Sequence, residues 1–186
     1  MGFDTPPTLR SGPVDPAPTL RSGPVDPAPT LRSGPWPLAD VERFLQQTAI
    51  PVRLASNGRE FPLVQSQWFL YEDSALWCCA QADSVLAQRL RNDPRCAFEV
   101  SGDHPPYKGV RGSGRASLHA DEAARILPLL IDRYLGQTPS QLADWLLSRL
   151  DVEVAIRIGD LAVTSWDYSA RMTAPAEMTA AADRRD

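Results

Sequence analysis

The N-terminus of the chain is an exact repeat, which restricts the fold to the residues that follow it. The string PTLRSGPV at residues 7–14 recurs at residues 18–25, and PTLRSGP occurs again at residues 29–35. Units so rich in proline bury too little apolar surface to offset the chain entropy lost on folding, and proline lacks a backbone donor. We therefore expect residues 1–35 to be disordered and to serve as a spacer or as a Pro-rich tail that binds a partner.

The rest of the chain has the composition of one globular domain. The chain has 186 residues, 43% of them apolar, which is enough for a single core. We expect this domain to cover residues 36–172. Residues 173–186, which end in Asp-Arg-Arg-Asp, are expected to form a flexible tail.

Charge and hydropathy exclude several classes of partner. The formal net charge is -4 and the pI is about 5.2, so the chain lacks the basic excess that a phosphate backbone or an anionic membrane attracts. No apolar run approaches the roughly 18 to 20 residues of a membrane span, and no basic stretch followed by an apolar core opens the chain. We expect a cytoplasmic protein with neither a nucleic-acid nor a membrane partner.

Cysteine and histidine are too sparse for a metal centre. Cys78, Cys79 and Cys96 lack the CxxC spacing that would present two sulfurs to zinc, and only His104 and His119 are available as imidazoles. We expect the cysteines to be small buried hydrophobes in a reducing compartment. We expect no metal site, and a histidine-based triad has little material from which to be built.

Short β-rich runs separated by turn signals make up most of the domain. Asn57-Gly58 stands between two such runs and favours a type I′ hairpin turn, in which both central residues have positive φ. The first three runs are expected to form an antiparallel meander. Strands are expected over residues 50–56, 59–71, 75–81, 96–101, 108–120, 152–159 and 161–168. Helices are expected to begin near residue 38, to run from residue 83 or 84 to 92, and to cover residues 121–135 and 139–150.

This order of elements favours a mainly β fold of the α+β kind. Short strands with one crossover helix, and a helical insertion before the last strands, fit a small closed barrel better than a doubly wound sheet. No GxGxxG string follows a strand and no Walker loop is present. Dinucleotide-binding and P-loop folds are therefore excluded.

Four strings in this order resemble the pyridoxamine 5′-phosphate oxidase-like, FMN-binding split-barrel family. They are IPVRLA at residues 50–55 with its Asn-Gly hairpin, QWF at 67–69, the segment 83–95, and VAIRI at 154–158 with TSWD at 164–167. The resemblance implies a six-to-seven-stranded antiparallel split β-barrel with flanking helices. It also implies a homodimer that holds FMN, or in some relatives a deazaflavin, between its subunits.

The resemblance also implies cofactor contacts. In such proteins a basic residue of the first strand, a serine opening the crossover helix, a late tryptophan and a following arginine contact the cofactor. These positions correspond here to Arg53, Ser84, Trp166 and Arg171. An arginine fork suits phosphate oxygens and an aromatic side chain can cover a ring.

One position departs from the family pattern. Leu86 stands where relatives commonly have lysine, two residues after the serine. The positive charge for a phosphate must then come from elsewhere. Arg111 and Arg115 are candidates, because alternation places both on one face of the strand expected over residues 108–120.

The function implied is that of an FMN-dependent oxidoreductase acting on a small organic substrate. Because a flavin carries the difficult chemistry, a shortage of acid–base side chains is no objection, and no catalytic residue is identified. One alternative is a non-catalytic cofactor- or ligand-binding split-barrel protein, which the leucine at position 86 favours. The other is a deazaflavin-dependent reductase.

Overall fold

The computed structural model describes residues 27–136 and 138–172 of the chain. The strands are β1 (Thr30–Ser33), β2 (Val52–Ser56), β3 (Leu63–Gln67), β4 (Leu70–Glu72), β5 (Ala75–Gln81), β6 (Arg95–Ser101), β7 (Lys108–His119) and β8 (Glu153–Asp167). The helices are α1 (Leu38–Gln47), α2 (Val85–Asn92), α3 (Ala123–Leu135), α4 (Gln141–Leu147), α5 (Ser169–Met172) and the short 3-10 helix η1 (Leu150–Val152). None of the helices in these described ranges is long and apolar enough to cross a lipid bilayer.

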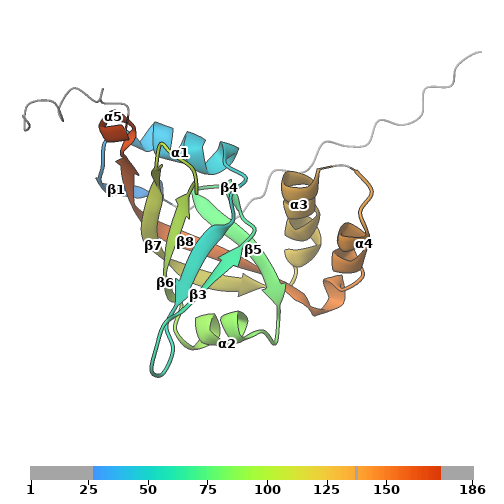
Figure 1. Ribbon diagram of the computed structural model, residues 1–186. Helices are drawn as coiled ribbons and strands as arrows, with labels where there is room; N and C mark the ends of the chain where they lie inside the picture. Colours follow the sequence, from blue (N-terminus) through green and yellow to red (C-terminus); the bar gives the residue numbers. More distant parts are fainter. Residues whose placement is uncertain (1–26, 137, 173–186) are drawn as a thin grey trace, which may run out of the picture.

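The strands form one curled sheet in the order β3-β2-β6-β7-β8-β5-β4, and every pair along this path is antiparallel. The two end strands, β3 and β4, are separated in the chain only by Trp68 and Phe69. The sheet must therefore curl until its ends approach each other, which gives the barrel seen in Figure 1. The expectation of a mainly β split barrel with flanking helices is confirmed.

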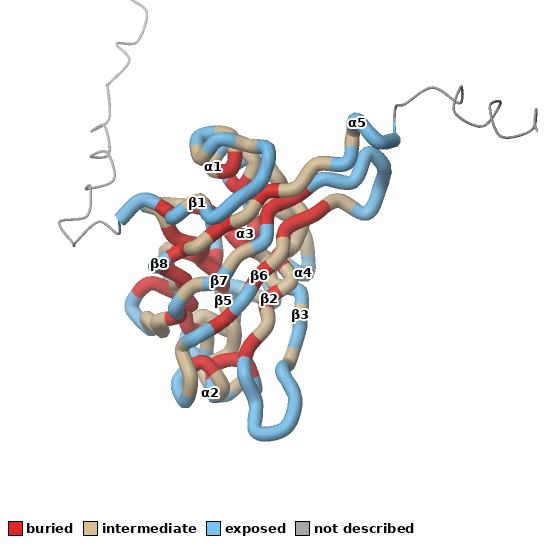
Figure 2. The backbone as a smooth tube through the Cα atoms, turned by 90° about the vertical axis from the view of Figure 1, so that its left-hand side faces the viewer, coloured by how far each residue is buried: buried red, intermediate tan, exposed pale blue. Residues whose placement is uncertain are grey.

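Alternation along the strands fills the barrel with apolar side chains. Leu54, Phe98, Val110 and Ile156 come from four different strands and are all at most 4% exposed. Helices α1 and α2 close the barrel with further apolar residues, and Figure 2 shows buried segments of the strands alternating with less buried ones. The interior is therefore packed, and any ligand site must lie on the outside.

Helix α3 covers one part of the outer face of the sheet. Ile126 and Leu130 of α3 pack on Ala75 and Trp77 of β5 and on Ala155 of β8 in a second apolar cluster. In Figure 1, α3 and α4 lie on the side of the barrel away from β6 and β7. The outer face of the sheet thus has a helix-covered part and a part over β2, β6, β7 and the end of β8 that no described helix covers.

The hairpin at Asn57-Gly58 forms, but its predicted turn type is wrong. Strands β2 and β3 pair up to Ser56 and Leu63, so the loop runs over residues 57–62, and neither Asn57 nor Gly58 has positive φ. The Asn57 amide donates instead to Asp93 (2.8 Å), a contact that holds the loop against the end of α2. The two-residue turn with both φ values positive is Asp73-Ser74 (51° and 58°), between β4 and β5.

Three further expectations about the strands need correction. The run over residues 59–71 divides into β3 and β4 because Phe69 turns into the core while Trp68 stacks on Tyr134 outside it, with ring centroids 5.1 Å apart. The expected meander is therefore correct only in part. β2 pairs with β3 and β4 pairs with β5, both antiparallel, but the second run is interrupted between β3 and β4, and the other edge of β5 pairs with β8. The two closing strands are one strand, β8, which passes through Asp160 at φ 52° beside a bulge in its pairing with β7.

The boundary expected at residue 36 also needs correction. Thr30–Ser33, in the last copy of the repeat, forms β1 and pairs with β8 in parallel. Pairing with an existing strand edge supplies the hydrogen bonds and contacts that the isolated repeat cannot make, so composition alone missed it. Residues 1–26 and 173–186, also expected to be disordered or flexible, lie outside the described residues.

Candidate functional site

A groove of about 600 Å³ lies on the uncovered part of the outer face. Its lining comes from β1, β2, β3, β6, β7 and β8, and it includes three arginines and one glutamate. Because successive residues of a strand point to opposite faces, the groove is lined by the outward residues of strands whose inward residues fill the core. The positions of its side chains therefore follow from strand register.

Strand register places the charged residues of the groove in one row across the sheet. Arg53 of β2 is opposite Glu99 of β6, which is opposite Arg111 of β7, which is opposite Thr164 of β8. Adjacent strands are about 4.8 Å apart, so each of these four side chains lies beside the next one across the sheet. Below we call these four residues the polar row.

The next outward row consists of small residues. Ala55, Ala97, Ser113 and Ala162 are opposite one another on β2, β6, β7 and β8, and all four line the groove. None of them projects beyond a Cβ or a hydroxyl. The polar row therefore borders a flat, shallow floor.

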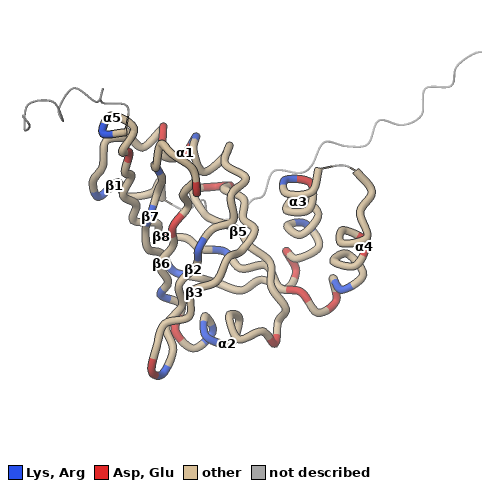
Figure 3. The backbone as a smooth tube through the Cα atoms, in the orientation of Figure 1, with Lys and Arg blue, Asp and Glu red and all other residues tan. Residues whose placement is uncertain are grey.

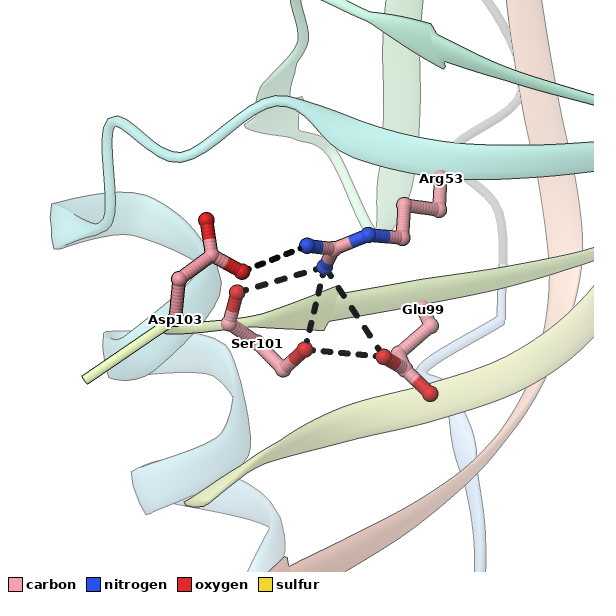
Figure 4. A network of polar contacts seen from close by, with 4 residues as sticks. All are labelled: Arg53, Glu99, Ser101 and Asp103. Atoms are coloured by element: carbon pink, nitrogen blue, oxygen red, sulfur yellow. Dashed lines mark hydrogen bonds and ion pairs between the residues drawn. The ribbon is translucent and has the colours of Figure 1, made fainter. Parts of the chain in front are cut away.

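Arg53 is held by a network of polar contacts (Figure 4). Its guanidinium donates to Asp103 Oδ1 (2.7 Å) and to Ser101 Oγ (3.1 Å), and lies 3.8 Å from Glu99 Oε1. The Ser101 hydroxyl in turn donates to Glu99 Oε1 at 2.8 Å. The network orients Arg53, and its two carboxylates offset the charge of Arg53 within the groove.

Arg32 and Arg111 differ from Arg53 in having no such partner. Within the described ranges, no carboxylate lies within 4.0 Å of either guanidinium, and Glu99, although opposite Arg111, is that close only to Arg53. Figure 3 shows several Lys and Arg positions along β6 and β7, on the side of the barrel that carries the groove. These two arginines leave net positive charge beside the flat floor, as an anionic ligand requires.

Sequence reasoning predicted Arg53 and Arg111 but missed Arg32. Arg32 belongs to β1, and its side chain reaches the groove because β1 pairs with the end of β8. The only sequence signal for it is the arginine of the repeat. That signal could not be used while the whole repeat was expected to be disordered.

Trp166 lies one outward position beyond the polar row. It is opposite Gly109 of β7, and a Cβ on that glycine would come 3.0 Å from Cζ2 of the indole, so the ring lies over the glycine. Tyr168 follows at 5.5 Å between ring centroids, and the Arg171 guanidinium lies 5.4 Å from the Tyr168 ring. An aromatic and cationic cluster therefore continues from the end of the groove, with Arg171 outside it.

Two other predicted residues do not line the groove. Arg115 shares the outer face with Arg111, as predicted, but lies opposite Arg95 beyond the row of small residues. Ser84 accepts a hydrogen bond from the backbone N–H of Ala87 (3.2 Å) and is the N-cap of α2. A cofactor contact by Arg115, Ser84 or Arg171 stays a prediction, and for all three residues it would involve a surface outside this groove.

Leu86 faces the barrel interior. It is 1% exposed and packs with Leu90 in the main core, whereas its neighbour Val85 is 58% exposed. A lysine at position 86 would be buried among apolar side chains rather than directed at a groove ligand. The structure therefore gives Leu86 a packing role.

A second cavity, of about 320 Å³, lies between the sheet and helices α3 and α4. Cys79 and Glu153 line it together with apolar residues. Burial raises the pKa of the Cys79 thiol to about 12 and also raises the pKa of the Glu153 carboxyl, an effect that Arg149 partly opposes. The thiol is therefore protonated at neutral pH and poorly suited to redox chemistry.

Cys78 and Cys96 are buried, as predicted, and Cys79 is half-buried. All three are free thiols, and burial raises the pKa of Cys96 to about 11. Within the described part of the chain, no group of three or more histidine, cysteine, aspartate or glutamate side chains is arranged to hold a metal ion.

No family model matches the sequence, and no curated protein matches it. Solved structures do match. A conserved hypothetical protein from Mycobacterium tuberculosis has a TM-score of 0.62 and 25% identity over 74% of this chain and 88% of that one. An F420 reductase has a TM-score of 0.54 and 21% identity over 64% and 92% of the two chains.

A further solved structure, from Listeria innocua, is assigned as a pyridoxamine 5′-phosphate oxidase. It has a TM-score of 0.51 and 20% identity over 64% of this chain and 90% of that one. Likeness at these identities concerns the fold, and each match spans most of the matched protein.

Proposed function

From the pyridoxamine 5′-phosphate oxidase-like split-barrel fold that this chain has, we propose that the groove binds a flavin-type cofactor and that the protein is a flavin-dependent oxidoreductase. The observation that carries this proposal is the pair Arg32 and Arg111, which have no carboxylate partner among the described residues and border a floor of small side chains. FMN is the cofactor proposed, because its single phosphate matches this small cationic patch.

The residues of the groove fit such a ligand in two respects. Arginine forks form charge-assisted, bidentate hydrogen bonds with phosphate oxygens, and Arg32 and Arg111 are free to do so. The floor formed by Ala55, Ala97 and Ala162 lets a planar ring approach the sheet closely. Trp166, over Gly109, offers an aromatic side chain at the end of the polar row.

The remaining residues of the groove orient rather than react. When bound, a flavin would supply the hydride or electron transfer. The chain would hold Arg53 in place through Asp103 and Ser101, and would present the Thr164 hydroxyl as a hydrogen-bonding group. Glu99 is engaged by Ser101 and Arg53, so it is not offered as a catalytic base.

We also propose that the protein acts as a homodimer. No described helix covers β2, β6 and β7 on the outside, so a planar ligand on this face of one chain would remain in contact with water. A second copy related by a two-fold axis would cover both grooves by the same contact. Ser84 or Arg171 could then reach a cofactor from the partner subunit.

Two other functions fit the same groove. A deazaflavin would use the same arginines, and likeness to an F420 reductase favours keeping this alternative. A binding protein without redox turnover would need the groove but no reactive partner. The absorption spectrum and reduction kinetics of the purified protein separate these three cases, because oxidised flavin, deazaflavin and colourless protein differ in the visible and near-ultraviolet range.

The proposal is tested by titrating the protein with FMN, FAD and a deazaflavin, with fluorescence quenching as the readout. Arg111→Ala should raise the FMN dissociation constant about ten-fold or more, since a charge-assisted hydrogen bond contributes roughly 1.5–3 kcal/mol. Arg115→Ala is the matched control, because it removes the same charge from the same strand and face outside the groove. Equal effects of the two variants, or no binding of any of the three ligands by the parent protein, would refute the assignment.

A further inference from the structure

The edge of β8 beside the groove is paired with β1, which belongs to the last copy of the N-terminal repeat. The chain contains two more copies of the same sequence. The first half of β8 is hydrogen-bonded to β5 on this edge, up to the pair Leu76 and Ile158. Beyond that point the edge is taken over by β1, with Thr30 opposite Ala162 and Leu31 opposite Val163. Figure 1 shows β1 beside the far end of β8. We call this second half of the edge the β8 slot.

The β8 slot contacts most residues of the motif PTLRSGP. Pro29 is buried and Leu31 packs against the main core. Ser33 Oγ shares a hydrogen bond with Thr164 Oγ1 at 3.3 Å. Gly34 has φ 119°, and a Cβ there would overlap the backbone carbonyl oxygen of Ser165, so only glycine fits.

The same seven residues occur twice more in the chain. Residues 7–13 and 18–24 repeat residues 29–35 without a single difference. Each copy therefore has the proline and leucine that face inward, the serine that meets Thr164 and the glycine that fits against Ser165. The first difference comes after the motif, where Trp36 of the last copy is replaced by valine in the other two.

Trp36 favours binding of the last copy in the β8 slot but does not prevent another copy from binding there. Its backbone N–H donates to Ser165 Oγ (3.0 Å), its indole N–H donates to Asp167 (3.3 Å) and its ring contacts Phe44 of α1. If residues 18–24 occupied the slot, these contacts could persist while the 11 residues of one repeat formed a loop. The entropy lost on closing a loop grows only slowly with its length.

We propose that the β8 slot is a binding site for the motif PTLRSGP and that the three copies in one chain compete for it, with residues 29–35 as the main occupant. Tethering keeps the other copies at high effective concentration, so they replace the last copy within the same chain rather than between chains. Whichever copy is bound presents its own arginine, Arg10, Arg21 or Arg32, at the groove. Any of the three copies can then provide both the strand that pairs with β8 and the arginine at the groove. This inference does not depend on any cofactor.

A disulfide trap in the full-length protein tests the exchange directly. The Ser33 and Thr164 hydroxyls are hydrogen-bonded, so cysteines at these two positions are close enough to be joined. Ser22→Cys with Thr164→Cys should form the corresponding disulfide within one chain when residues 18–24 occupy the slot. Adding Gly34→Val, which excludes the last copy, should increase the yield.

The matched control is Ser22→Cys with Thr164→Cys, Gly34→Val and Gly23→Val. The last substitution leaves the tether unchanged but prevents residues 18–24 from fitting against Ser165, so the cross-link should be lost. An equal yield with and without Gly23→Val would show random collision of a tethered thiol and would overturn the proposal. Cross-linking mainly between chains, seen as covalent dimers that increase with concentration, would overturn the intramolecular form proposed here.

Thermal unfolding of full-length variants gives a second, independent readout. Gly34→Val alone should lower the melting temperature less than Gly12→Val, Gly23→Val and Gly34→Val together, because the single variant keeps two competent copies. Gly12→Val with Gly23→Val should leave the melting temperature unchanged, since the main occupant is intact. If the single and triple variants lost the same amount, the other copies would not be able to replace the last one, and the proposal would fail.

Discussion

The helix-covered and uncovered parts of the outer face belong to the same sheet, and β8 runs through both, but they have opposite chemistry. Under α3 the outward residues are apolar, such as Ala75 and Trp77, and they form a sealed cluster with Ile126 and Leu130. Over β2, β6 and β7 the outward residues are charged or small, and they line an open groove. An apolar outward residue attracts a helix from the same chain, whereas a charged row beside a flat floor does not. The uncovered part is therefore where another molecule is expected to bind.

The largest expected effect concerns the barrel interior, which lies beneath both parts. Leu86→Lys should destabilise the protein by roughly 3–5 kcal/mol, because it removes a fully buried side chain and places an unpaired ammonium in the core. Val85→Lys is the matched control on the exposed side of α2 and should change the free energy of unfolding by less than about 0.5 kcal/mol. Urea unfolding curves measure both values.

The same pair also tests how position 86 relates to the groove. If a side chain at position 86 pointed into the groove, as the lysine of the family pattern is expected to contact the cofactor, Leu86→Lys would leave stability intact and tighten FMN binding. That result would contradict the packing role given to Leu86. A large loss of stability in both variants would instead mean that α2 is oriented differently from the structure described above.

The contrast between the two parts of the outer face predicts the second-largest effect. Leu130→Ala, in the covered part, should lower the free energy of unfolding by about 2–4 kcal/mol, because the side chain is 1% exposed and packs between α3 and β5. Arg111→Ala, in the uncovered part, should change it by no more than about 0.5 kcal/mol. Similar losses in chemical denaturation would show that both parts are structural and that the groove is no ligand site.

A third prediction fills the groove without disturbing the fold. Ala97 is exposed and belongs to the flat floor, so Ala97→Leu should leave the melting temperature within about 2 °C of the parent and strongly weaken FMN binding. Ala97→Ser keeps the side chain small and should bind FMN as the parent does. Unchanged affinity in Ala97→Leu would place the cofactor elsewhere, even if the protein does bind one.

Local sequence patterns predicted much of this arrangement because they depend on short-range geometry. Alternation placed Arg111 and Arg115 on one face of β7, and the helix expected to begin at residue 83 or 84 does begin there, with Ser84 as its N-cap. The outcome for Leu86 also follows a local pattern, since Leu86 and Leu90 share the apolar face of a helix. These features need no knowledge of which strands become neighbours.

The features that the sequence could not supply all depend on distant partners. Arg32 reaches the groove only because the edge of β8 is free beyond β5, and nothing within the repeat indicates that edge. The loop after β2 is wide because Asn57 bonds to Asp93, 36 residues away, although its sequence favours a tight turn. Division of the second run into β3 and β4 likewise follows from the stacking of Trp68 on Tyr134. Tertiary contacts overrode local preference in each case.

The smallest expected effect lies at the rim of the covered part, in the cavity beneath α3 and α4. Burial raises the pKa of the Glu153 carboxyl, so folding favours its protonated form. A raised folded-state pKa means that the stability from this group is complete below its unfolded pKa and is lost as pH rises through the folded value. The raised pKa of Glu153 therefore makes the folded protein less stable at pH 7 than it would be with a neutral side chain at this position. Glu153→Gln should remove this cost and raise the melting temperature at pH 7 slightly, by less than about 3 °C.

The pH dependence distinguishes this cause from a packing effect of the new amide. The difference between Glu153→Gln and the parent should shrink as the pH is lowered below the unfolded pKa of glutamate, because the parent carboxyl is then protonated as well. Asp151→Asn, on the exposed side of η1, is the matched control and should show no comparable gain. A gain in melting temperature that stays constant from pH 7 to pH 4, or an equal gain in the control, would mean that burial of the Glu153 carboxyl does not oppose folding. The edge of the covered part would then be more open to water than its centre.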